Sequence, residues 1–166
     1  MPKIEGLAPI IDNNSKVLIL GTMPGEESLR KQEYYGNPRN QFWPIIYSVF
    51  NTDLESSYKA KIYFIKEKGI ALWDVIKCCE RKGSADSQIY DVCLNDFNLL
   101  LAEYPGIKGI FFGGQKAYRI FQKRVRLDLY TNLTLKELPS TSPANARMSM
   151  EAKIKEWVML KTFLLS

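Results

Sequence analysis

The sequence predicts an α/β protein, a three-layer α/β/α sandwich built around a short, mainly parallel four-stranded sheet. Short aliphatic runs alternate with longer amphipathic segments along the chain, and this alternation is typical of parallel strands joined by helices that cover both faces of a sheet. No internal repeat, low-complexity tract or linker divides the 166 residues, a length that suits one domain. We therefore expect a single domain over residues 1–166.

Four segments have the composition of strands. The run 16–21 is aliphatic and ends in a turn of glycine and proline, which suits a strand buried on both faces. The runs 70–75 and 107–112 share this pattern. Segment 133–138 alternates more strongly between apolar and polar residues, so we expect it near an edge of the sheet.

Six segments have the periodicity of helices. Ser28 is a suitable cap for the first, a short helix that runs to about residue 35. Gly69 closes the helix 58–68 in the position of a C-terminal cap. The other predicted helices cover residues 41–50, 94–103, 115–125 and 148–164.

The composition indicates a soluble globular chain with a restricted catalytic repertoire. Apolar residues make up 46% and charged residues 25%, and the longest apolar runs are too short to cross a bilayer. Because the N-terminus lacks a signal-like pattern, a cytoplasmic location is expected. The chain has no histidine, which excludes Ser-His-Asp and Cys-His catalysis.

Cysteine content and charge narrow the expected partners. Cys78 and Cys79 are adjacent and poor partners for each other, and Cys93 is the third cysteine, so no disulfide framework is expected. Three thiols without histidine do not suggest a zinc or iron–sulfur site, and we predict no metal and no cofactor. The net charge of +5 is a modest bias toward anionic partners.

Three unusual segments follow predicted strand ends: 21–25, the stretch after Asp74, and 139–147. The carboxyl ends of parallel strands meet at one edge of a sheet, where ligands bind. We therefore expect one cleft to collect all three segments.

The segment Gly21-Thr22-Met23-Pro24-Gly25 has two interpretations. Its glycines allow close approach of a ligand to the main chain, and the helix start near Ser28 would direct amide groups and a positive dipole end toward an anion. Alternatively, it is an ordinary strand-to-helix turn. It matches neither the Walker A nor the dinucleotide-binding pattern.

The stretch 34–43 concentrates aromatic residues, amides and an arginine in a turn. Tyr35 and Phe42 flank this turn, where their rings could stack on a planar base. Asn40 either caps the following helix or uses its amide to hold a water or read a base edge. The loop 138–147 combines hydroxyls with two prolines, which suits contacts to phosphates or, alternatively, a turn that caps the last helix.

Together these segments resemble the uracil-DNA glycosylase superfamily, most closely its hypoxanthine-DNA (deoxyinosine) glycosylase branch, with the mismatch-specific uracil and thymine glycosylases as relatives. The resemblance covers most of the chain in the correct order. The segments that carry it are Gly21 to Gly25 with Ser28-Leu29 and Asn37 to Trp43, then Gly69 to Val75, Gly83-Ser84 and Asp86-Ser87, and finally Leu138 to Asn145.

This resemblance implies a monofunctional enzyme of base excision repair. Such enzymes flip a damaged or mismatched nucleotide out of DNA and hydrolyse the bond between base and sugar with a positioned water, without a cofactor. For this chain it implies hypoxanthine as the favoured base, uracil next, and DNA as the partner of a monomer. Catalysis must then come from placing the water and from stabilising separated charge in a dry pocket.

The resemblance also assigns site residues. The base pocket would be formed by Gly21, Thr22, Met23, Pro24, Gly25, Tyr35, Phe42 and Asp74. DNA would be bound by Ser28, Arg39, Ser84, Ser87, Ser140, Thr141, Ser142, Pro143, Asn145 and Arg147, with Asn145 or Arg147 filling the gap that flipping leaves.

Met23 departs from the relatives, which carry an asparagine or an acid at its position. Methionine can neither activate nor orient a water, so this role must lie elsewhere. Asn40 is the predicted catalytic residue, because the hypoxanthine branch places its working amide there, and Asp74 and Asp86 are the alternatives.

Two other classes of function stay open at this point. A non-catalytic DNA-binding module of the same fold would account for Met23. A small α/β nucleotide hydrolase would require a metal-binding acidic cluster, and the sequence contains no such cluster of carboxylates. The glycosylase ranks first, the binding module second and the nucleotide hydrolase third.

Overall fold

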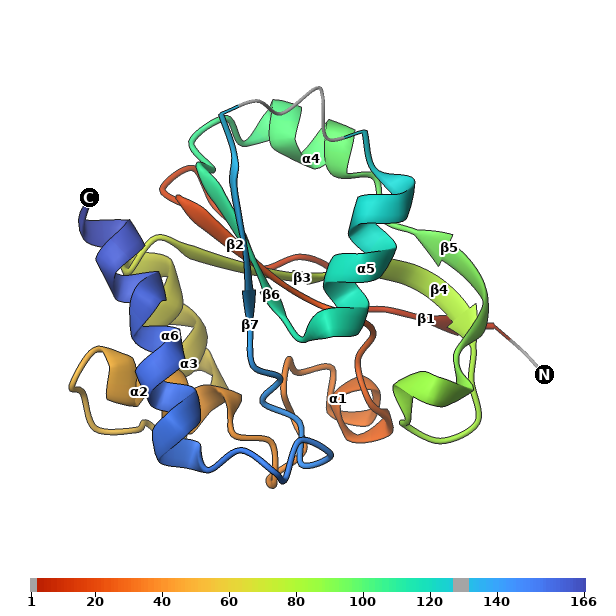
Figure 1. Ribbon diagram of the computed structural model, residues 1–166, viewed down its shortest axis with the longest axis horizontal. Helices are drawn as coiled ribbons and strands as arrows, with labels where there is room; N and C mark the ends of the chain where they lie inside the picture. Colours follow the sequence, from red (N-terminus) through yellow and green to blue (C-terminus); the bar gives the residue numbers. More distant parts are fainter. Residues whose placement is uncertain (1–2, 127–131) are drawn as a thin grey trace.

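The computed structural model describes residues 3–126 and 132–166. Four parallel strands form its main sheet, in the order β3-β2-β6-β7 (Figure 1). Their bounds are β2 Val17–Gly21, β3 Ile70–Asp74, β6 Gly109–Gly113 and β7 Thr134–Leu138. The predicted sheet is confirmed, including the edge position of β7.

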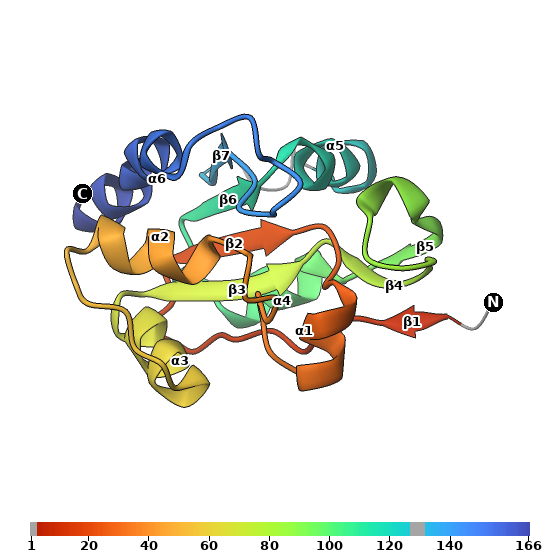
Figure 2. The same ribbon diagram turned by 90° about the horizontal axis from the view of Figure 1, so that it is seen from below.

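Helices cover both faces of this sheet, as Figure 2 shows. They are α1 Glu26–Lys31, α2 Phe42–Val49, α3 Tyr58–Glu67, α4 Phe97–Glu103, α5 Gln115–Arg124 and α6 Met150–Leu165, with a 3₁₀ turn at Asp86–Gln88. Because helices cover both faces of the sheet, the predicted three-layer α/β/α arrangement is confirmed. Within the described residues, no helix is both long and apolar enough to span a membrane.

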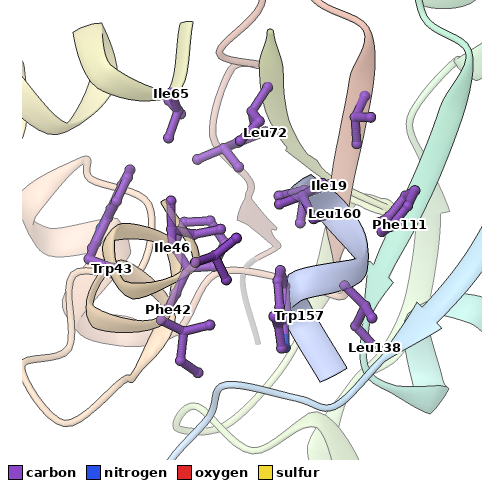
Figure 3. Packing of buried hydrophobic residues seen from close by; sticks show 14 of the residues in the cluster. Ile19, Phe42, Trp43, Ile46, Ile65, Leu72, Phe111, Leu138, Trp157 and Leu160 are labelled. Carbon is purple, nitrogen blue, oxygen red and sulfur yellow. The ribbon is translucent and has the colours of Figure 1, made fainter. Parts of the chain in front are cut away.

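Strand β2 contributes alternate side chains to two separate cores. Val17 and Ile19 pack with residues of α2, α3 and α6, such as Phe42, Ile65 and Trp157 (Figure 3). Leu18 and Leu20 point to the other face, where they pack with residues of α4 and α5 such as Phe97 and Phe121. Because successive strand side chains point in opposite directions, a continuous aliphatic run is what a sheet covered on both faces requires.

A second, smaller sheet was not predicted. It consists of β1 Ile4–Glu5, β4 Ile76–Glu80 and β5 Tyr90–Leu94, antiparallel in the order β1-β4-β5. Strand β4 continues almost directly from β3, and this extension carries the chain from the main sheet toward the N-terminal strand (Figure 1).

The small sheet corrects two predictions. Helix α4 begins at Phe97 and not at residue 94, because Leu94 belongs to β5 and the Asp96 side chain caps the helix by accepting from the Leu99 N–H. The expectation of no disulfide is also wrong: the β4–β5 register places Cys78 opposite Cys93, and the two are joined. Cys79 is free and buried.

Two cap predictions differ in outcome. Gly69 follows α3 with a left-handed φ of 80°, and its N–H donates to the Lys66 carbonyl, as expected of a residue that closes a helix. The cap predicted at Ser28 is wrong, because α1 begins at Glu26 and already contains Ser28.

Candidate active site

A cavity of about 820 Å³ lies at the carboxyl edge of the main sheet. The ends of β2, β3 and β6 reach it through Gly21, Asp74 and Gly113. The segments 21–28, 84–87 and 140–144 form most of its wall, with Tyr34, Tyr35, Asn37, Arg39 and Asn40. The structure thus brings the three segments that follow strand ends into one cleft.

Asp74 lies at the floor of this cavity, opposite Gly21 in the β2–β3 register. The pairing of the two strands continues past their ends, since the Val75 N–H donates to the Gly21 carbonyl (2.9 Å) and the Ile76 N–H to the Thr22 carbonyl (3.1 Å). A Cβ at Gly21 would lie 2.7 Å from Asp74 Oδ1. Because glycine has no Cβ, Gly21 leaves space for the Asp74 carboxyl group.

The carboxyl group of Asp74 is almost completely removed from solvent. Its residue is 7% exposed, and Oδ2 is buried without a hydrogen-bond partner among the described residues. Burial, and secondarily the charge of Asp86, raises the pKa of Asp74 to about 7, while Arg81 opposes the shift. Near neutral pH the group is therefore divided between the protonated form, which donates, and the carboxylate, which accepts.

Asp86 and Thr22 also line the cavity. Desolvation raises the pKa of Asp86, and the nearby charge of Lys116 lowers it. The nearby Thr22 hydroxyl also helps to lower the pKa of Asp86. Lys116 also donates from Nζ to the Asp86 carbonyl, which links α5 to the loop that carries Asp86.

Arg81 holds the loop 21–25 in place, and sequence reasoning missed it. The side chain is 3% exposed, and it donates from Nη2 to the Pro24 carbonyl (2.6 Å) and from Nε to the Gly83 carbonyl (2.8 Å). A charged residue directly after an unpredicted strand offered no pattern from which burial could be inferred. The two carbonyls show that Arg81 ties the first loop to the 83–87 segment.

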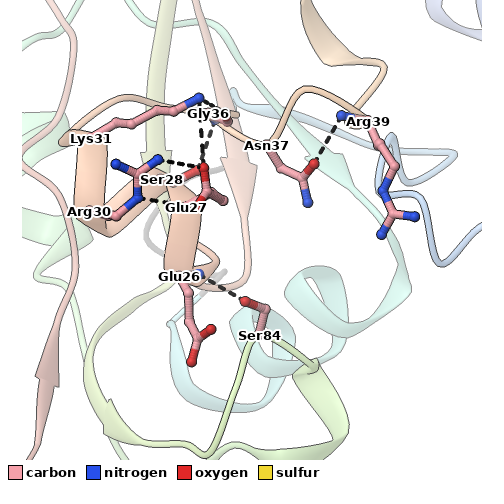
Figure 4. A network of polar contacts seen from close by, with 9 residues as sticks. All are labelled: Glu26, Glu27, Ser28, Arg30, Lys31, Gly36, Asn37, Arg39 and Ser84. Carbon is pink, nitrogen blue, oxygen red and sulfur yellow. Dashed lines mark hydrogen bonds and ion pairs between the residues drawn. The ribbon is translucent and has the colours of Figure 1, made fainter.

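Ser84 and Ser28, both predicted to bind DNA, hold protein groups in this structure. Ser84 Oγ accepts from the Glu26 N–H at the start of α1 (2.8 Å), so one of the amides expected to face an anion already has a partner (Figure 4). Ser28 is buried, and its Oγ accepts from the Gly36 N–H (2.9 Å). Both residues line the cavity and also brace its wall.

The aromatic residues of the turn are layered. Tyr35 lines the cavity, with a left-handed φ of 55°. Its ring stacks on Phe42, with centroids 3.8 Å apart. Phe42 is fully buried and lies behind Tyr35, outside the cavity wall in which it was expected. Burial, and then the charge of Asp74, raises the pKa of Tyr35, which keeps its hydroxyl protonated.

Asn40 stabilises the start of α2 and also lines the cavity. Its Oδ1 accepts from the Phe42 N–H at the start of α2 (2.9 Å), and its own N–H donates to the Asn37 carbonyl (2.9 Å). The side chain also lines the cavity. An amide keeps a second lone pair on oxygen and two donors on nitrogen, so the bond that fixes Asn40 leaves it able to hold a further polar group.

Arg39 and Ser87 are exposed at the cavity wall. The Arg39 N–H donates to Asn37 Oδ1 (2.9 Å), which stabilises the backbone of the turn and leaves the guanidinium exposed (Figure 4). Arg147 is also exposed, but it lies outside the cavity wall.

The loop 139–147 is organised by its own side chains. Ser140 Oγ accepts from the Ser142 N–H, Ser142 Oγ accepts from the Ala144 N–H (both 3.2 Å), and Asn145 Nδ2 donates to the Ser140 carbonyl (3.0 Å). Ser140, Thr141, Ser142 and Pro143 line the cavity, whereas Asn145 braces the loop from outside that wall. The loop is therefore pre-shaped.

Gln41 and Lys153 were also missed. Lys153, on α6, is 2% exposed and donates from Nζ to Gln41 Oε1 (2.7 Å). The Gln41 N–H donates to the Thr141 carbonyl (3.0 Å). No sequence signal identified either residue, because the contact joins positions 112 residues apart.

Metal ligands do not gather in the part of the chain that the structure describes: residues 3–126 and 132–166 contain no group of three or more His, Cys, Asp or Glu side chains placed to hold an ion.

A family model and individual known proteins both match this chain. A family model for the uracil DNA glycosylase superfamily matches residues 8–163. A hypoxanthine DNA glycosylase of Methanosarcina barkeri is 37% identical over 156 residues, 93% of this chain and 96% of the relative. A hypoxanthine DNA glycosylase of Methanosarcina acetivorans is 40% identical over 154 residues, 92% of this chain and 94% of the relative.

A solved structure extends this likeness to the fold. The solution NMR structure of a Methanosarcina acetivorans protein regarded as a uracil DNA glycosylase superimposes with a TM-score of 0.84, at 37% identity, over 99% of this chain and 100% of that one. Sequence, fold and the family model agree over nearly the whole length, and the chain therefore belongs to the uracil DNA glycosylase superfamily.

Proposed function

We propose that this DNA glycosylase flips out and hydrolytically removes a deaminated base from DNA in base excision repair, with hypoxanthine favoured and uracil next. The observation that carries the proposal is a cavity at the carboxyl edge of the sheet, which combines an anchored amide, Asn40, with a buried carboxyl group, Asp74. The two relatives named hypoxanthine DNA glycosylases, 37% and 40% identical, support the choice of base.

The chemistry requires an enclosed site. The bond between base and sugar is shielded inside the duplex, so the nucleotide must leave the stack before water can reach it. Cleavage then leaves positive charge on the sugar and negative charge on the base. A cavity with fixed dipoles stabilises that separation better than water does, because its dipoles need not reorganise.

Asn40 is the residue we assign to the attacking water. Two hydrogen bonds hold its turn, and its amide borders the cavity. Met23 occupies the corresponding place in the first loop, is 7% exposed, and packs with Ile76 and Cys79 in a small apolar cluster. Its thioether offers a water only a weak acceptor, which supports the assignment to Asn40.

Asp74 is the residue we assign to the departing base. In its protonated form the carboxyl group can donate a hydrogen bond to a carbonyl or ring nitrogen that gains negative charge. The ionised form would repel that charge. A pKa of about 7 makes the donor form available at physiological pH.

The DNA strand itself would contact the rim of the cavity. Arg39, Ser87, Ser140, Ser142 and Pro143 border the cavity and would meet phosphates, whereas Thr141 is buried and would support the loop. Exposed Arg147 is the better candidate for filling the gap, since Asn145 is engaged in its own loop. We also propose that the protein acts as a monomer and in the cytoplasm, in line with a substrate that is a single duplex.

One feature favours a second candidate, a DNA-binding module without catalysis. Met23 lacks the polar side chain expected at this position in the mismatch-specific and other branches of the superfamily, and a module would tolerate that loss. The buried, unpartnered Asp74 Oδ2 argues for the enzyme, because an isolated polar group in a cavity costs stability unless a ligand uses it.

One assay separates glycosylase, binding module and nucleotide hydrolase. The protein is incubated with chelator and duplexes that carry a single hypoxanthine, uracil or mismatched thymine, followed by alkali. We expect strand breakage at hypoxanthine fastest and at uracil more slowly. Binding without breakage at any lesion would support the module, and nucleotide hydrolysis restored by magnesium would support the hydrolase.

A further inference from the structure

A lysine is buried beside the candidate site without lining it. Lys153 lies in the first turn of α6 and is 2% exposed, and the hydrogen bond described for its side chain runs from Nζ to Gln41 Oε1 at 2.7 Å. Desolvation lowers its pKa. Burying an ammonium group is costly, and a neutral amide repays less of that cost than a carboxylate would. A charge kept at such a position calls for a reason other than packing.

Gln41 connects this lysine to two walls of the cavity. Its backbone stands between Asn40 and Phe42 at the start of α2, and its carbonyl accepts from the Ile45 N–H (2.9 Å). Its N–H donates to the Thr141 carbonyl (3.0 Å) in the opposite loop. The side chain of Gln41 is therefore held by α6 while its backbone joins the Asn40 turn to Thr141.

Trp157 makes a parallel connection one turn further along α6. Its Nε1 donates to the Pro139 carbonyl (3.0 Å), and its ring is fully buried in the main core. Lys153 and Trp157 are four residues apart and so lie on the same face of the helix. One face of α6 thus holds the Asn40 turn through Gln41 and the 139–147 loop through Pro139.

We propose that Lys153 is a positioning residue for base excision, acting through Gln41 to fix the distance between Asn40 and the Ser140–Ser142 wall. The proposal rests on the proposed glycosylase activity. Rates of enzymes depend on placements of about an ångström. An apolar replacement of Lys153 removes the desolvation cost of the buried ammonium group, which offsets part of the loss of its hydrogen bond to Gln41. The positioning role therefore predicts a loss of activity that is large compared with the change in stability.

The first test replaces the ammonium group and keeps the stem. We expect Lys153→Met to slow single-turnover excision of hypoxanthine at saturating enzyme about tenfold, with DNA affinity within about twofold of wild type and a Tm lowered by no more than about 4 °C. Lys155→Met, an exposed lysine on the same helix, is the matched control and should leave all three values unchanged. A Lys153→Met rate within twofold of wild type overturns the proposal.

A second pair of variants acts at the other end of the contact and decides the matter if Lys153→Met does not fold. Gln41→Glu keeps an acceptor oxygen for Lys153 and should keep the excision rate, while Gln41→Leu removes it and should slow excision about tenfold. The double variant Lys153→Met/Gln41→Leu should be no slower than the slower single variant, because the two side chains act as one unit. Equal rates for Gln41→Glu and Gln41→Leu, or fully additive losses, contradict the role.

The two proposals fail in distinguishable ways. If the wild-type protein releases neither hypoxanthine nor uracil, the proposed function is wrong and no excision exists for Lys153 to support. If the wild type releases hypoxanthine and Lys153→Met releases it equally fast, the glycosylase stands and only the positioning role is lost.

Discussion

The loop 21–25 and the turn 37–41 line the same cavity but present different parts of the chain to it. Thr22, Met23 and Pro24 are buried, and the loop is held through a carbonyl that Arg81 binds. In the turn, Asn40 is only half-buried and Arg39 is exposed. Their backbone N–H groups donate to Asn37, and Asn40 Oδ1 accepts from the Phe42 N–H. The first segment therefore contributes shape, and the second contributes the side chains that can take part in chemistry.

The largest expected effect lies in the turn. Asn40→Ala removes the amide assigned to the water, and we expect single-turnover excision of hypoxanthine to fall by about 10²–10³-fold. The same change removes the Oδ1 contact at the start of α2, so stability should fall by about 1 kcal/mol. If Asn40→Ala retains the wild-type excision rate with DNA binding intact, the role of positioning the water belongs to Asp74 or Asp86 and not to Asn40.

The loop should respond to shape alone. Gly21→Ala places a methyl group 2.7 Å from Asp74 Oδ1, so the carboxyl group or the backbone must move. We expect excision to slow by about tenfold to a hundredfold and stability to fall by about 1–3 kcal/mol. Gly83→Ala is a poor control because Gly83 has a left-handed φ of 78°, whereas Gly113→Ala meets its nearest atom at 3.9 Å and should be milder.

The carboxyl group of Asp74 should make the excision rate depend on pH. If its protonated form assists the departing base, the excision rate should fall by about tenfold between pH 6 and pH 8, as the group ionises around its pKa of about 7. Asp86 and Arg81 are the charged neighbours that shift this pKa, and the Tyr34 and Tyr35 hydroxyls, whose own pKa values are raised by burial and then by Asp74, stay protonated over this range. Asp74→Asn keeps a donor that does not titrate, so its rate should be flat over this range. Equal slopes for both proteins would exclude the role.

The same group also makes stability depend on pH. Its carboxyl binds a proton more tightly in the folded state, with a pKa of about 7, than at its ordinary value of 3.8. The folded protein therefore holds more protons, and the free energy of unfolding should decrease as pH rises from about 4 to about 7. Chemical denaturation at several pH values measures this slope, which Asp74→Asn should reduce.

The smallest effect on excision is expected at Ser84, which supports the wall of the cavity from the segment 84–87. Ser84→Ala removes the hydroxyl that accepts from the Glu26 N–H, which should cost about 1 kcal/mol of stability and leave excision at saturating enzyme within about twofold. A loss as large as that of Gly21→Ala would show that Ser84 contacts the substrate and does more than cap α1.

Much of the fold followed from the sequence because periodic burial leaves a direct mark on it. The alternate residues of 17–20 serve two cores, and such a run can only suit a sheet covered on both faces. Strands β4 and β5 escaped prediction because they carry charged and cysteine residues in place of an aliphatic run, and because they pair with each other across a loop. The Cys78–Cys93 link was lost with them.

The site could be predicted from the sequence only in part. The order of the motifs predicted which segments meet in one cleft, but it did not predict which side chains face the cavity, because that depends on tertiary packing. Phe42 and Tyr35 are both aromatic and flank one turn, and the structure alone puts Tyr35 in front. Arg81, Gln41 and Lys153 act through carbonyl and amide contacts made over long sequence separations, for which the sequence holds no local pattern.

The continued β2–β3 pairing at Gly21 and Thr22 has a consequence for how new specificities can arise. Because ladder hydrogen bonds extend beneath Asp74, the depth of the cavity is set by the sheet and cannot be changed without disturbing both cores. The segments 84–87 and 140–144 lie outside the sheet and are held by single contacts such as those from the Glu26 N–H to Ser84 Oγ and from the Gln41 N–H to the Thr141 carbonyl. Variants designed to admit a different base should therefore change these two segments and keep Gly21 and Asp74 at the floor of the cavity.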